Sequence, residues 1–173
     1  VRNAVENRDL KATFVCTRLP VWHRNVRKRI VRTPKLHWLD SGLVCHLLGI
    51  ESPEQLVSHP LRGAVFESWV FAEVYKRIVH RGATPSIFHY RERRGAEIDL
   101  VVDAADRIVL VDAKSAATVA GEWFAPRLRL RDDLVAHGEA RTIDLWLVHG
   151  GDAAYERQGV RLVPWWQVPD QGW

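Results

Sequence analysis

The sequence has 173 residues and a formal charge of +4 at pH 7, with 47% apolar and 27% charged residues. This length suits one domain, or one domain with an appended arm, and the composition supports a packed core rather than a disordered chain. No apolar run approaches the roughly 18 residues of a membrane-spanning helix, and the first residues lack the apolar stretch of a signal peptide, so we expect neither element.

The first 35 residues carry the basic excess of the chain. They contain ten basic and two acidic residues, whereas residues 36–173 contain fifteen basic and nineteen acidic residues. We expect a short helix near Val1–Arg8 and an extended stretch over Thr13–Trp22. The basic run His23–Arg29 is typical of a solvated surface, and the other interpretation is a contact with phosphate groups or with a partner protein.

Short elements connect this basic segment to the rest of the chain. Lys35–Leu39 has the pattern of a short strand, and Asp40-Ser41 can cap a helix over Gly42–Leu48. The segment Ser52–Gln55 has the pattern of a capping box with proline at the first helical position, so a second short helix should follow. We therefore predict a basic N-terminal arm with small helices over residues 1–60.

The predicted core domain, residues 61–173, begins with a long helix from Leu61 to about His80 and continues with strands and a second helix. The strand patterns are Ser86–Glu92, Glu97–Asp103, Arg107–Ser115, Thr142–Val148 and Val160–Val163, and the second helix covers about Glu122–His137. Only Ala104–Asp106 separates the second and third strands, which predicts a hairpin. This order predicts a mixed central sheet with flanking helices, an α/β (α+β) fold.

A helix turns by 100° per residue, and this rotation gives the long helix an apolar stripe with Glu67 in its middle. The other members of the stripe are Gly63, Val70, Phe71, Val74 and Ile78. Burying a carboxylate there is costly unless it is paired, hydrogen-bonded or bound to a metal ion. Glu67 is therefore either half of a buried salt bridge to an arginine or lysine, or a candidate site residue.

Two aspartates face each other in the predicted hairpin. Side chains alternate between the two faces of a strand. On the first strand of the hairpin, one face carries Glu97, Asp99 and Val101, and the other carries Ile98, Leu100 and Val102. On the returning strand, one face carries Ile108, Leu110, Asp112 and Lys114. If the turn is centred between Ala105 and Asp106, residues whose numbers sum to 211 pair, and Asp99 lies opposite Asp112. Opposed carboxylates destabilise a sheet unless positive charge lies between them. A divalent cation together with Lys114 would supply that charge.

Glu67, Asp99, Asp112 and Lys114 together form a set with catalytic potential. Carboxylate oxygens bind hard cations such as Mg²⁺ or Mn²⁺, which keep several waters and accept phosphate oxygens as further ligands. Such a metal lowers the pKa of a bound water and offsets transition-state charge, and a lysine can orient that water. The same residue types are also compatible with a solvent-facing strand of alternating charges.

At these residues the sequence resembles the PD-(D/E)xK nuclease superfamily, whose motif would be Glu67, Asp99 and Asp112-Ala113-Lys114. More narrowly, it is similar to the domain of unknown function found C-terminal to AAA-type ATPase modules in bacterial and archaeal proteins. The likeness spans roughly residues 15–150. Five segments carry it: Pro34–Leu43, Phe66–Val70, Tyr90-Arg91, Gly95–Leu100 and Val111–Ser115.

The resemblance implies a restriction-endonuclease-like core and a Mg²⁺- or Mn²⁺-dependent phosphodiester hydrolase acting on DNA. It implies that Asp99, Asp112 and the Ala113 carbonyl bind the metal, that Lys114 positions the attacking water, and that Glu67 binds a second metal or orients a ligand water. The family more often has glutamate at the position of Asp112. The chain has no Gly-x-x-x-x-Gly-Lys-(Ser/Thr) sequence, so we expect no ATP site in it.

Arginine and tryptophan side chains are the candidate nucleic-acid contacts. Arg91, Arg93 and Arg94 precede the hairpin and can pair with phosphates in a bidentate manner, although arginine outnumbers lysine 20 to 5 throughout. We interpret Arg127, Arg129 and Arg131 as ordinary surface charge. Trp165-Trp166 can stack on bases, and the alternative is a place in the core or in an interface.

Two further functions remain open. The domain could keep a nuclease fold without catalysis and bind nucleic acid or a partner protein, with a salt-dependent and metal-independent affinity. It could also serve assembly of an ATPase module in the same parent polypeptide, with self-association through Val1–Lys35 or the C-terminal tryptophans. The chain contains no methionine, which suggests a piece of a longer polypeptide. Cys16 and Cys45 match no metal-ligand spacing, so we expect a reduced, cytoplasmic setting.

Overall fold

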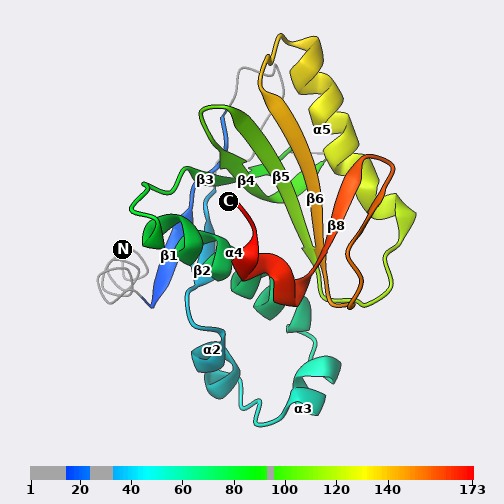
Figure 1. The fold of residues 1–173 in the computed structure, drawn as a ribbon. Helices are drawn as coiled ribbons and strands as arrows, with labels where there is room; N and C mark the ends of the chain where they lie inside the picture. Colours follow the sequence, from blue (N-terminus) through cyan, green and yellow to red (C-terminus); the bar gives the residue numbers. More distant parts are fainter. Residues whose placement is uncertain (1–14, 24–32, 93–95) are drawn as a thin grey trace.

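A six-stranded mixed sheet forms the centre of the described structure, a computed structural model that covers residues 15–23, 33–92 and 96–173 (Figure 1). The sheet has the order β3-β4-β5-β6-β8-β7, and β1 and β2 form a separate antiparallel pair. The elements are β1 (Cys16–Leu19), β2 (Lys35–Trp38), α2 (Ser41–Leu47), α3 (Pro53–Ser58), α4 (Arg62–His80), β3 (Ile87–Arg91), β4 (Glu97–Asp103), β5 (Arg107–Lys114), η1 (Gly121–Phe124), α5 (Ala125–Ala136), β6 (Thr142–His149), β7 (Tyr155–Arg157), β8 (Val160–Pro164) and η2 (Trp165–Asp170).

The strand directions confirm the predicted mixed sheet. β3, β4 and β5 form an antiparallel meander, and α5 then connects β5 to β6, which pairs with β5 in parallel. β8 adds to β6 in parallel, and the short edge strand β7, which the sequence patterns did not predict, pairs with β8 in antiparallel fashion. The chain is therefore an α/β protein in which a helix, a three-strand meander, a second helix and a strand follow one another.

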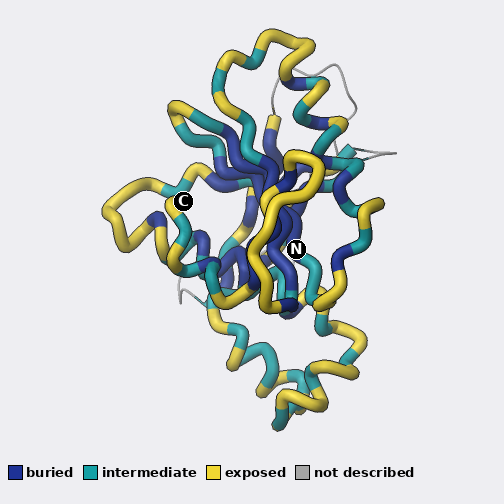
Figure 2. Tube along the Cα trace, turned by 45° about the vertical axis from the view of Figure 1, so that its right-hand side comes forward, coloured by how far each residue is buried: buried dark blue, intermediate teal, exposed yellow. Residues whose placement is uncertain are grey.

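Helices cover both faces of the sheet. α4 and η2 pack on one face, where Val70, Phe71 and Val74 of α4 meet Val111 and Val148 of the sheet. α5 packs on the other face, where Leu130 and Leu134 share a cluster with Leu110, Leu147 and Leu162. Figure 2 shows the strands as the most deeply buried part of the molecule, between these two layers. Within the described ranges, no helix combines the length and the apolar character that crossing a bilayer requires.

The predicted caps define the two short helices. The Asp40 side chain accepts a hydrogen bond from the Leu43 amide at 3.0 Å and starts α2. Ser52 accepts from the Gln55 amide at 3.4 Å and starts α3, but the Gln55 side chain accepts from the Glu51 amide rather than from that of Ser52. The predicted capping box is therefore only half formed.

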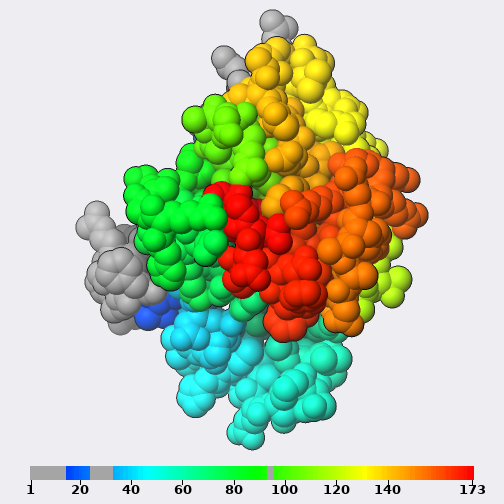
Figure 3. Space-filling view, viewed as in Figure 1, coloured from blue at the N-terminus to red at the C-terminus, as the bar shows by residue number. Residues whose placement is uncertain are grey.

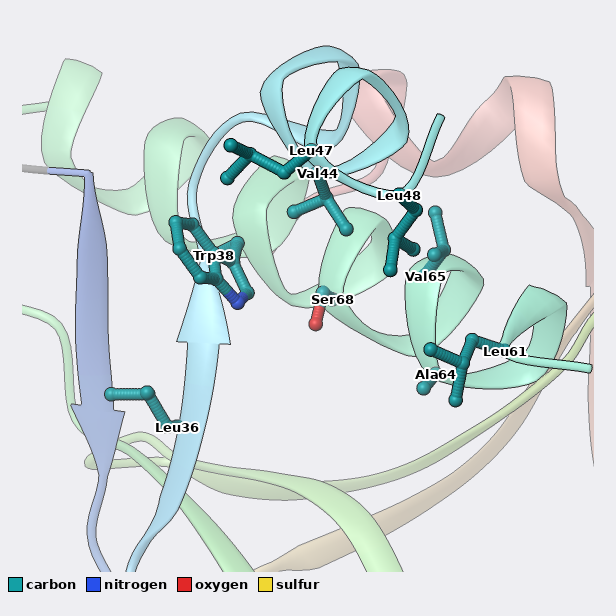
Figure 4. A pocket seen from close by; sticks show the side chains of 9 residues that line it. All are labelled: Leu36, Trp38, Val44, Leu47, Leu48, Leu61, Ala64, Val65 and Ser68. Atoms are coloured by element: carbon teal, nitrogen blue, oxygen red, sulfur yellow. The ribbon is translucent and has the colours of Figure 1, made fainter. Parts of the chain in front are cut away.

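α2 and α3 form an arm beside α4, visible at the bottom of Figures 1 and 3. Neither helix contributes a buried residue, and the arm leaves an apolar pocket of about 290 Å³ against β2 and α4. Figure 4 shows the side chains that line it: Leu36, Trp38, Val44, Leu47, Leu48, Leu61, Ala64, Val65 and Ser68. The arm therefore rests on the domain without belonging to its core.

A β-bulge interrupts β4 at Asp99. β3 and β4 pair as Phe88 with Val101 and then as Tyr90 with Ile98, so two residues of β4 lie opposite the single His89 of β3. As a result Ile98 packs in the α5-side cluster, whereas Leu100 packs on the α4 side. The prediction that Ile98 and Leu100 share one face is therefore wrong, because strict alternation does not hold through a bulge.

Two predicted segments lie outside the described residues. These are the helix near Val1–Arg8 and all but the first residue of the basic run His23–Arg29.

Candidate functional site

Three carboxylates converge on the ammonium group of Lys35. The Lys35 Nζ lies 2.8 Å from Glu67 Oε1, 2.9 Å from Glu97 Oε1 and 3.2 Å from Asp99 Oδ1. Glu67 comes from α4, Glu97 and Asp99 come from β4, and Lys35 comes from β2. We call Glu67, Glu97 and Asp99 the acid cluster. Glu67 lies on the sheet-facing side of α4 as predicted, and its partner in the described structure is a lysine.

The pKa values of Lys35 and Glu67 are both shifted by their surroundings in this cluster. Burial disfavours the charged ammonium of Lys35, but Asp99 and Glu67 outweigh that penalty and raise its pKa well above the ordinary value. Burial and the neighbouring Asp99 raise the pKa of Glu67, against the opposing effect of Lys35. Lys35 therefore remains charged at neutral pH, while Glu67 holds a proton more readily than an exposed glutamate.

A buried histidine lies beside the same carboxylates. His37 of β2 stacks on Phe71 at 4.6 Å between ring centroids, and its Nδ1 lies 3.2 Å from Ser68 Oγ. Its Nε2 is buried, finds no hydrogen-bond partner among the described residues and lies 3.9 Å from Glu67 Oε1. Burial, followed by the charge of Lys35, lowers the pKa of His37 to about 4, so the ring is neutral at pH 7.

Where the β4–β5 ladder ends, the side chains of Asp99 and Asp112 accept hydrogen bonds from backbone amides in place of backbone carbonyl groups. Leu100 pairs with Val111, Val101 with Leu110, Val102 with Val109 and Asp103 with Ile108, all in the predicted register. One step further, the Asp99 amide donates to Asp112 Oδ1 at 3.0 Å and the Ala113 amide donates to Asp99 Oδ2 at 3.1 Å. The two carboxylates therefore lie across from each other, each held by the other strand's backbone.

Asp112 pairs with a fully buried arginine. Its Oδ2 contacts Nη1 of Arg127 from α5, and Nη2 of Arg127 donates to the Trp123 carbonyl at 2.8 Å. Burial and the charge of Asp99 raise the pKa of Asp112 to about 7, although Arg127 opposes this shift. Arg127 has 0% of its surface exposed, so its interpretation as ordinary surface charge is wrong. It lies between Phe124 and Leu130 on the sheet-facing side of η1 and α5.

Lys114 reaches the acid cluster from the end of β5. Its Nζ lies 3.9 Å from Asp99 Oδ2, and its side chain is 39% exposed. It lines an open pocket of about 340 Å³ together with Gly63, Glu67, Ala113, Ser115, Ala116 and Trp123. The structure thus brings Glu67, Asp99 and Lys114 to one place, and it turns the carboxylate of Asp112 toward Arg127.

The structure describes only some of the residues that were predicted to contact nucleic acid. Arg91 lies at the end of β3, with its Nε 3.5 Å from Glu97 Oε2, and it is therefore linked to the acid cluster. Arg93 and Arg94 lie outside the described residues. Trp165 packs edge-on against Trp69 at 5.6 Å between ring centroids, and both Trp165 and Trp166 are about half exposed.

The predicted metal ligands do not fit a metal ion in the arrangement that the structure shows. Across residues 15–23, 33–92 and 96–173, no three histidine, cysteine, aspartate or glutamate side chains are placed to hold one. The physical reason is that protein cations already neutralise the predicted ligands, since Lys35 contacts Glu67 and Asp99 and Arg127 contacts Asp112. The donor chemistry of the acid cluster, all carboxylate oxygen, nevertheless matches what Mg²⁺ and Mn²⁺ prefer.

Four residues of the site were not predicted, namely Lys35, His37, Glu97 and Arg127. The helical spacing of Phe124, Arg127, Leu130 and Leu134 could have revealed Arg127, because it places an arginine inside an apolar stripe just as it places Glu67. Lys35 and His37 had no such local signal. They reach the site only because β2 packs against α4.

Comparisons with known proteins identify the region that carries this site. The family model described as Domain of unknown function (DUF4143) matches residues 62–168, which is more than half of the chain. A second model, described as Domain of unknown function (DUF8612), matches residues 8–54. Two proteins named as uncharacterized, from Mycobacterium tuberculosis and Mycobacterium bovis, are each 30% identical over 109 residues. These matches cover 63% of the chain and 24% of each mycobacterial protein, so the chain spans about a quarter of its curated relatives.

Proposed function

The chain belongs to the family described as Domain of unknown function (DUF4143), and we propose that it is a phosphodiester hydrolase of the PD-(D/E)xK type that acts on DNA with Mg²⁺ or Mn²⁺. In this proposal the core is restriction-endonuclease-like. The domain works beside an ATPase module of the same parent polypeptide, in the cytoplasm. The remaining length of the mycobacterial relatives, which the chain does not match, leaves room for such a module.

The observation that carries the proposal is the convergence of Glu67, Asp99 and Lys114 from three elements. They come from α4, β4 and β5, and Glu67 and Lys114 line one open pocket. Asp99 does not line this pocket but lies 3.9 Å from Lys114, and two acids and a lysine close together are groups that phosphodiester hydrolysis uses. The order of helix, three-strand meander, helix and strand supports the same assignment.

Each of these side chains has a role that its environment supports. The exposed ammonium of Lys114 can hold a phosphate oxygen or orient a water molecule beside Asp99. Glu67, with its raised pKa, can hold or accept a proton at the pocket wall. A divalent cation would supply further positive charge for the phosphate, but in the described arrangement Lys35 holds the place where the acid cluster would bind it.

A non-catalytic module is the second candidate. Lys35 and Arg127 neutralise the predicted metal ligands, and a nuclease fold whose acids are paired in this way can bind DNA without cleaving it. In that case the affinity for DNA would fall with salt and would not depend on divalent metal.

A cleavage assay with matched lysine variants tests the proposal. We expect the wild type to nick supercoiled DNA in the presence of Mn²⁺, and Lys114→Ala to lower the rate by at least about 100-fold. Lys76→Ala is the control, because Lys76 pairs with Glu73 on the surface of α4 and should leave the rate unchanged. If Lys114→Ala cleaves as fast as the wild type, the catalytic assignment is wrong. A wild type that binds DNA with equal affinity with and without Mn²⁺, and never cleaves it, favours the second candidate.

A further inference from the structure

We propose that a pocket between the arm, α4 and η2 binds an unpaired nucleobase, so that the domain engages DNA where a strand is not base-paired. We call it the aromatic pocket, because Phe66, Trp69 and Trp165 line it. The identity of the ligand as DNA rests on the proposed function. The pocket has a volume of about 470 Å³, within the range of sites that hold small molecules. Neither Lys114 nor any of the predicted acids lines it.

The three aromatic side chains suit a flat ligand. Phe66 and Trp69 of α4 stack at 6.2 Å between ring centroids, with 27° between their planes. Trp165 of η2 meets Trp69 edge-on, at 5.6 Å and 69°. A planar ring can therefore lie against the face of one side chain while its edge meets another, and these are the two geometries that aromatic pairs prefer. Trp165 is 43% exposed, so part of this aromatic surface is open to solvent.

The rest of the lining favours stacking over hydrogen bonding to the edge of a base. The guanidinium of Arg62 already donates to the Ser115 carbonyl at 2.5 Å and to the Val57 carbonyl at 3.4 Å. Stacking accepts any base, because every base has a π-face. A base inside a duplex is covered by its neighbours and must leave the stack before a pocket can hold it. The aromatic pocket therefore fits a base that is already unpaired.

The aromatic pocket continues into the pocket of Lys114. Ser115 lines both pockets and directly follows Lys114 in the chain. The Gly150 amide fixes this junction, since it lies 3.2 Å from the Lys114 carbonyl and 3.0 Å from the Ala116 carbonyl. A Cβ at Gly150 would lie 2.3 Å from the Ser115 carbonyl oxygen, so no side chain fits there. A nucleotide carries its base and its phosphate on one sugar, and a phosphate held by Lys114 places that base beside the aromatic pocket.

The charges around the pocket favour a nucleic acid over an apolar protein segment. Arg62 lines the aromatic pocket, and the 39% exposed side chain of Lys114 lies next to it. Within the part of the chain that the structure describes, no acidic side chain lines the aromatic pocket. Glu67 lines the neighbouring pocket, where Lys35 neutralises it. Aromatic faces beside cationic groups are the combination that holds single strands.

The test compares a fluorescein-labelled DNA single strand of about 12 nucleotides with the matching blunt duplex, both in EDTA. In fluorescence anisotropy the wild type should bind the single strand at least about tenfold more tightly than the duplex. Trp165→Ala should lose about tenfold in affinity for the single strand, as expected for the loss of one base stack. Trp166→Ala is the matched control and should bind as the wild type does, because Trp166 is similarly exposed but does not line the pocket.

Equal affinity of Trp165→Ala and Trp166→Ala for the single strand would overturn the inference, as would equal binding of single strand and duplex by the wild type. A second measurement on the wild type covers the case in which Trp165→Ala does not fold. A single strand that carries iododeoxyuridine should crosslink on irradiation to Phe66, Trp69 or Trp165, as located by mass spectrometry. Crosslinks confined to residues outside the aromatic pocket would contradict the inference.

These results separate the inference from the proposed function. Weaker single-strand binding by Trp165→Ala, without DNA cleavage by the wild type in Mn²⁺, would support the base pocket and contradict the hydrolase. Cleavage by a wild type that neither prefers single strands nor depends on Trp165 would support the hydrolase and contradict the base pocket. A wild type that does not bind single strands but forms a dimer that Trp165→Ala dissociates, in chromatography with light scattering, would assign the pocket to a contact between copies and overturn the inference.

Discussion

Two ion-pair centres lie next to each other in this domain and differ in their access to water. Lys35 with the acid cluster is partly exposed, whereas Arg127 with Asp112 is sealed between the sheet and α5. They meet at a single hydrogen bond of 3.0 Å, from the Asp99 amide to Asp112 Oδ1. The same residue types therefore lie in two different environments: the buried pair fixes the end of the β4–β5 ladder, and the partly exposed cluster keeps its charges in contact with solvent.

The largest expected effect is at the buried pair. Arg127→Met leaves the Asp112 carboxylate buried without its cationic partner, and we expect a loss of about 3–5 kcal/mol in the free energy of unfolding. Urea denaturation followed by circular dichroism measures it. Arg127→Met combined with Asp112→Asn should lose less than the sum of the two single variants. An Arg127→Met variant as stable as the wild type would contradict the assignment of this pair as a structural anchor.

His37, which lies beside the acid cluster, and Asp112 should change stability in opposite directions on acidification. Below pH 6.5 the unfolded chain protonates His37 while the folded chain, with a pKa of about 4, does not, so stability falls by about 3 kcal/mol as the pH drops to 4. Asp112 has the opposite sign. Its folded pKa of about 7 lies above the unfolded value of 3.8, so its contribution is present at low pH and is lost as the pH rises from 4 to 7.

Urea unfolding at several pH values between 7 and 4 separates these contributions. His37→Asn should lose less stability than the wild type on acidification, and Asp112→Asn should lose more. Parallel pH profiles for all three proteins would show that neither group titrates as its environment indicates.

A smaller effect is expected at the exposed cluster. Lys35→Met leaves three carboxylates that repel one another. We expect it to lower the free energy of unfolding by about 1–2 kcal/mol in metal-free, low-salt buffer. Because the cluster is in contact with solvent, we expect this cost to shrink markedly in 1 M salt, whereas the cost of Arg127→Met should persist. Unfolding curves at low and high salt for both variants test the contrast. Equal salt sensitivity would remove the distinction between the two centres.

The smallest effect is expected in the arm. Asp40→Ala removes the side-chain cap of α2 and should cost about 1 kcal/mol, seen as faster amide exchange within that helix. Since α2 contributes no buried residue, amide exchange in β4 and β5 should not change. Faster exchange in β4 or β5 would mean that the arm is coupled to the central sheet after all.

Local patterns predicted most of the helices and strands, but not β7 or η2, and they predicted part of the site. The turn between β4 and β5 is so short that it fixes the pairing, and the observed pairs from Leu100–Val111 to Asp103–Ile108 have the predicted register. Helical periodicity likewise placed Glu67 toward the sheet. These predictions succeeded because each depends on residues that are close together in the sequence.

The parts that could not be predicted depend on packing between distant segments. Lys35 is 32 residues from Glu67 and 64 from Asp99, so its contacts follow from the packing of β2 on α4 rather than from any motif. The bulge at Asp99 arises from the pairing of β4 with β3, which periodicity within one strand does not reveal. Arg127 was not predicted for a different reason. Helical spacing places it in an apolar stripe, but the many arginines of the chain favoured a surface interpretation.

The ion pairs between Lys35 and the acid cluster also have an evolutionary consequence. Lys35 belongs to the segment matched by one family model, residues 8–54, whereas all three carboxylates belong to the segment matched by the other, residues 62–168. Recombination that joined the second segment to a foreign first segment would separate the lysine from its acids. Such a descendant would need a new cation from another side chain or from a metal ion, so the two segments are best inherited together.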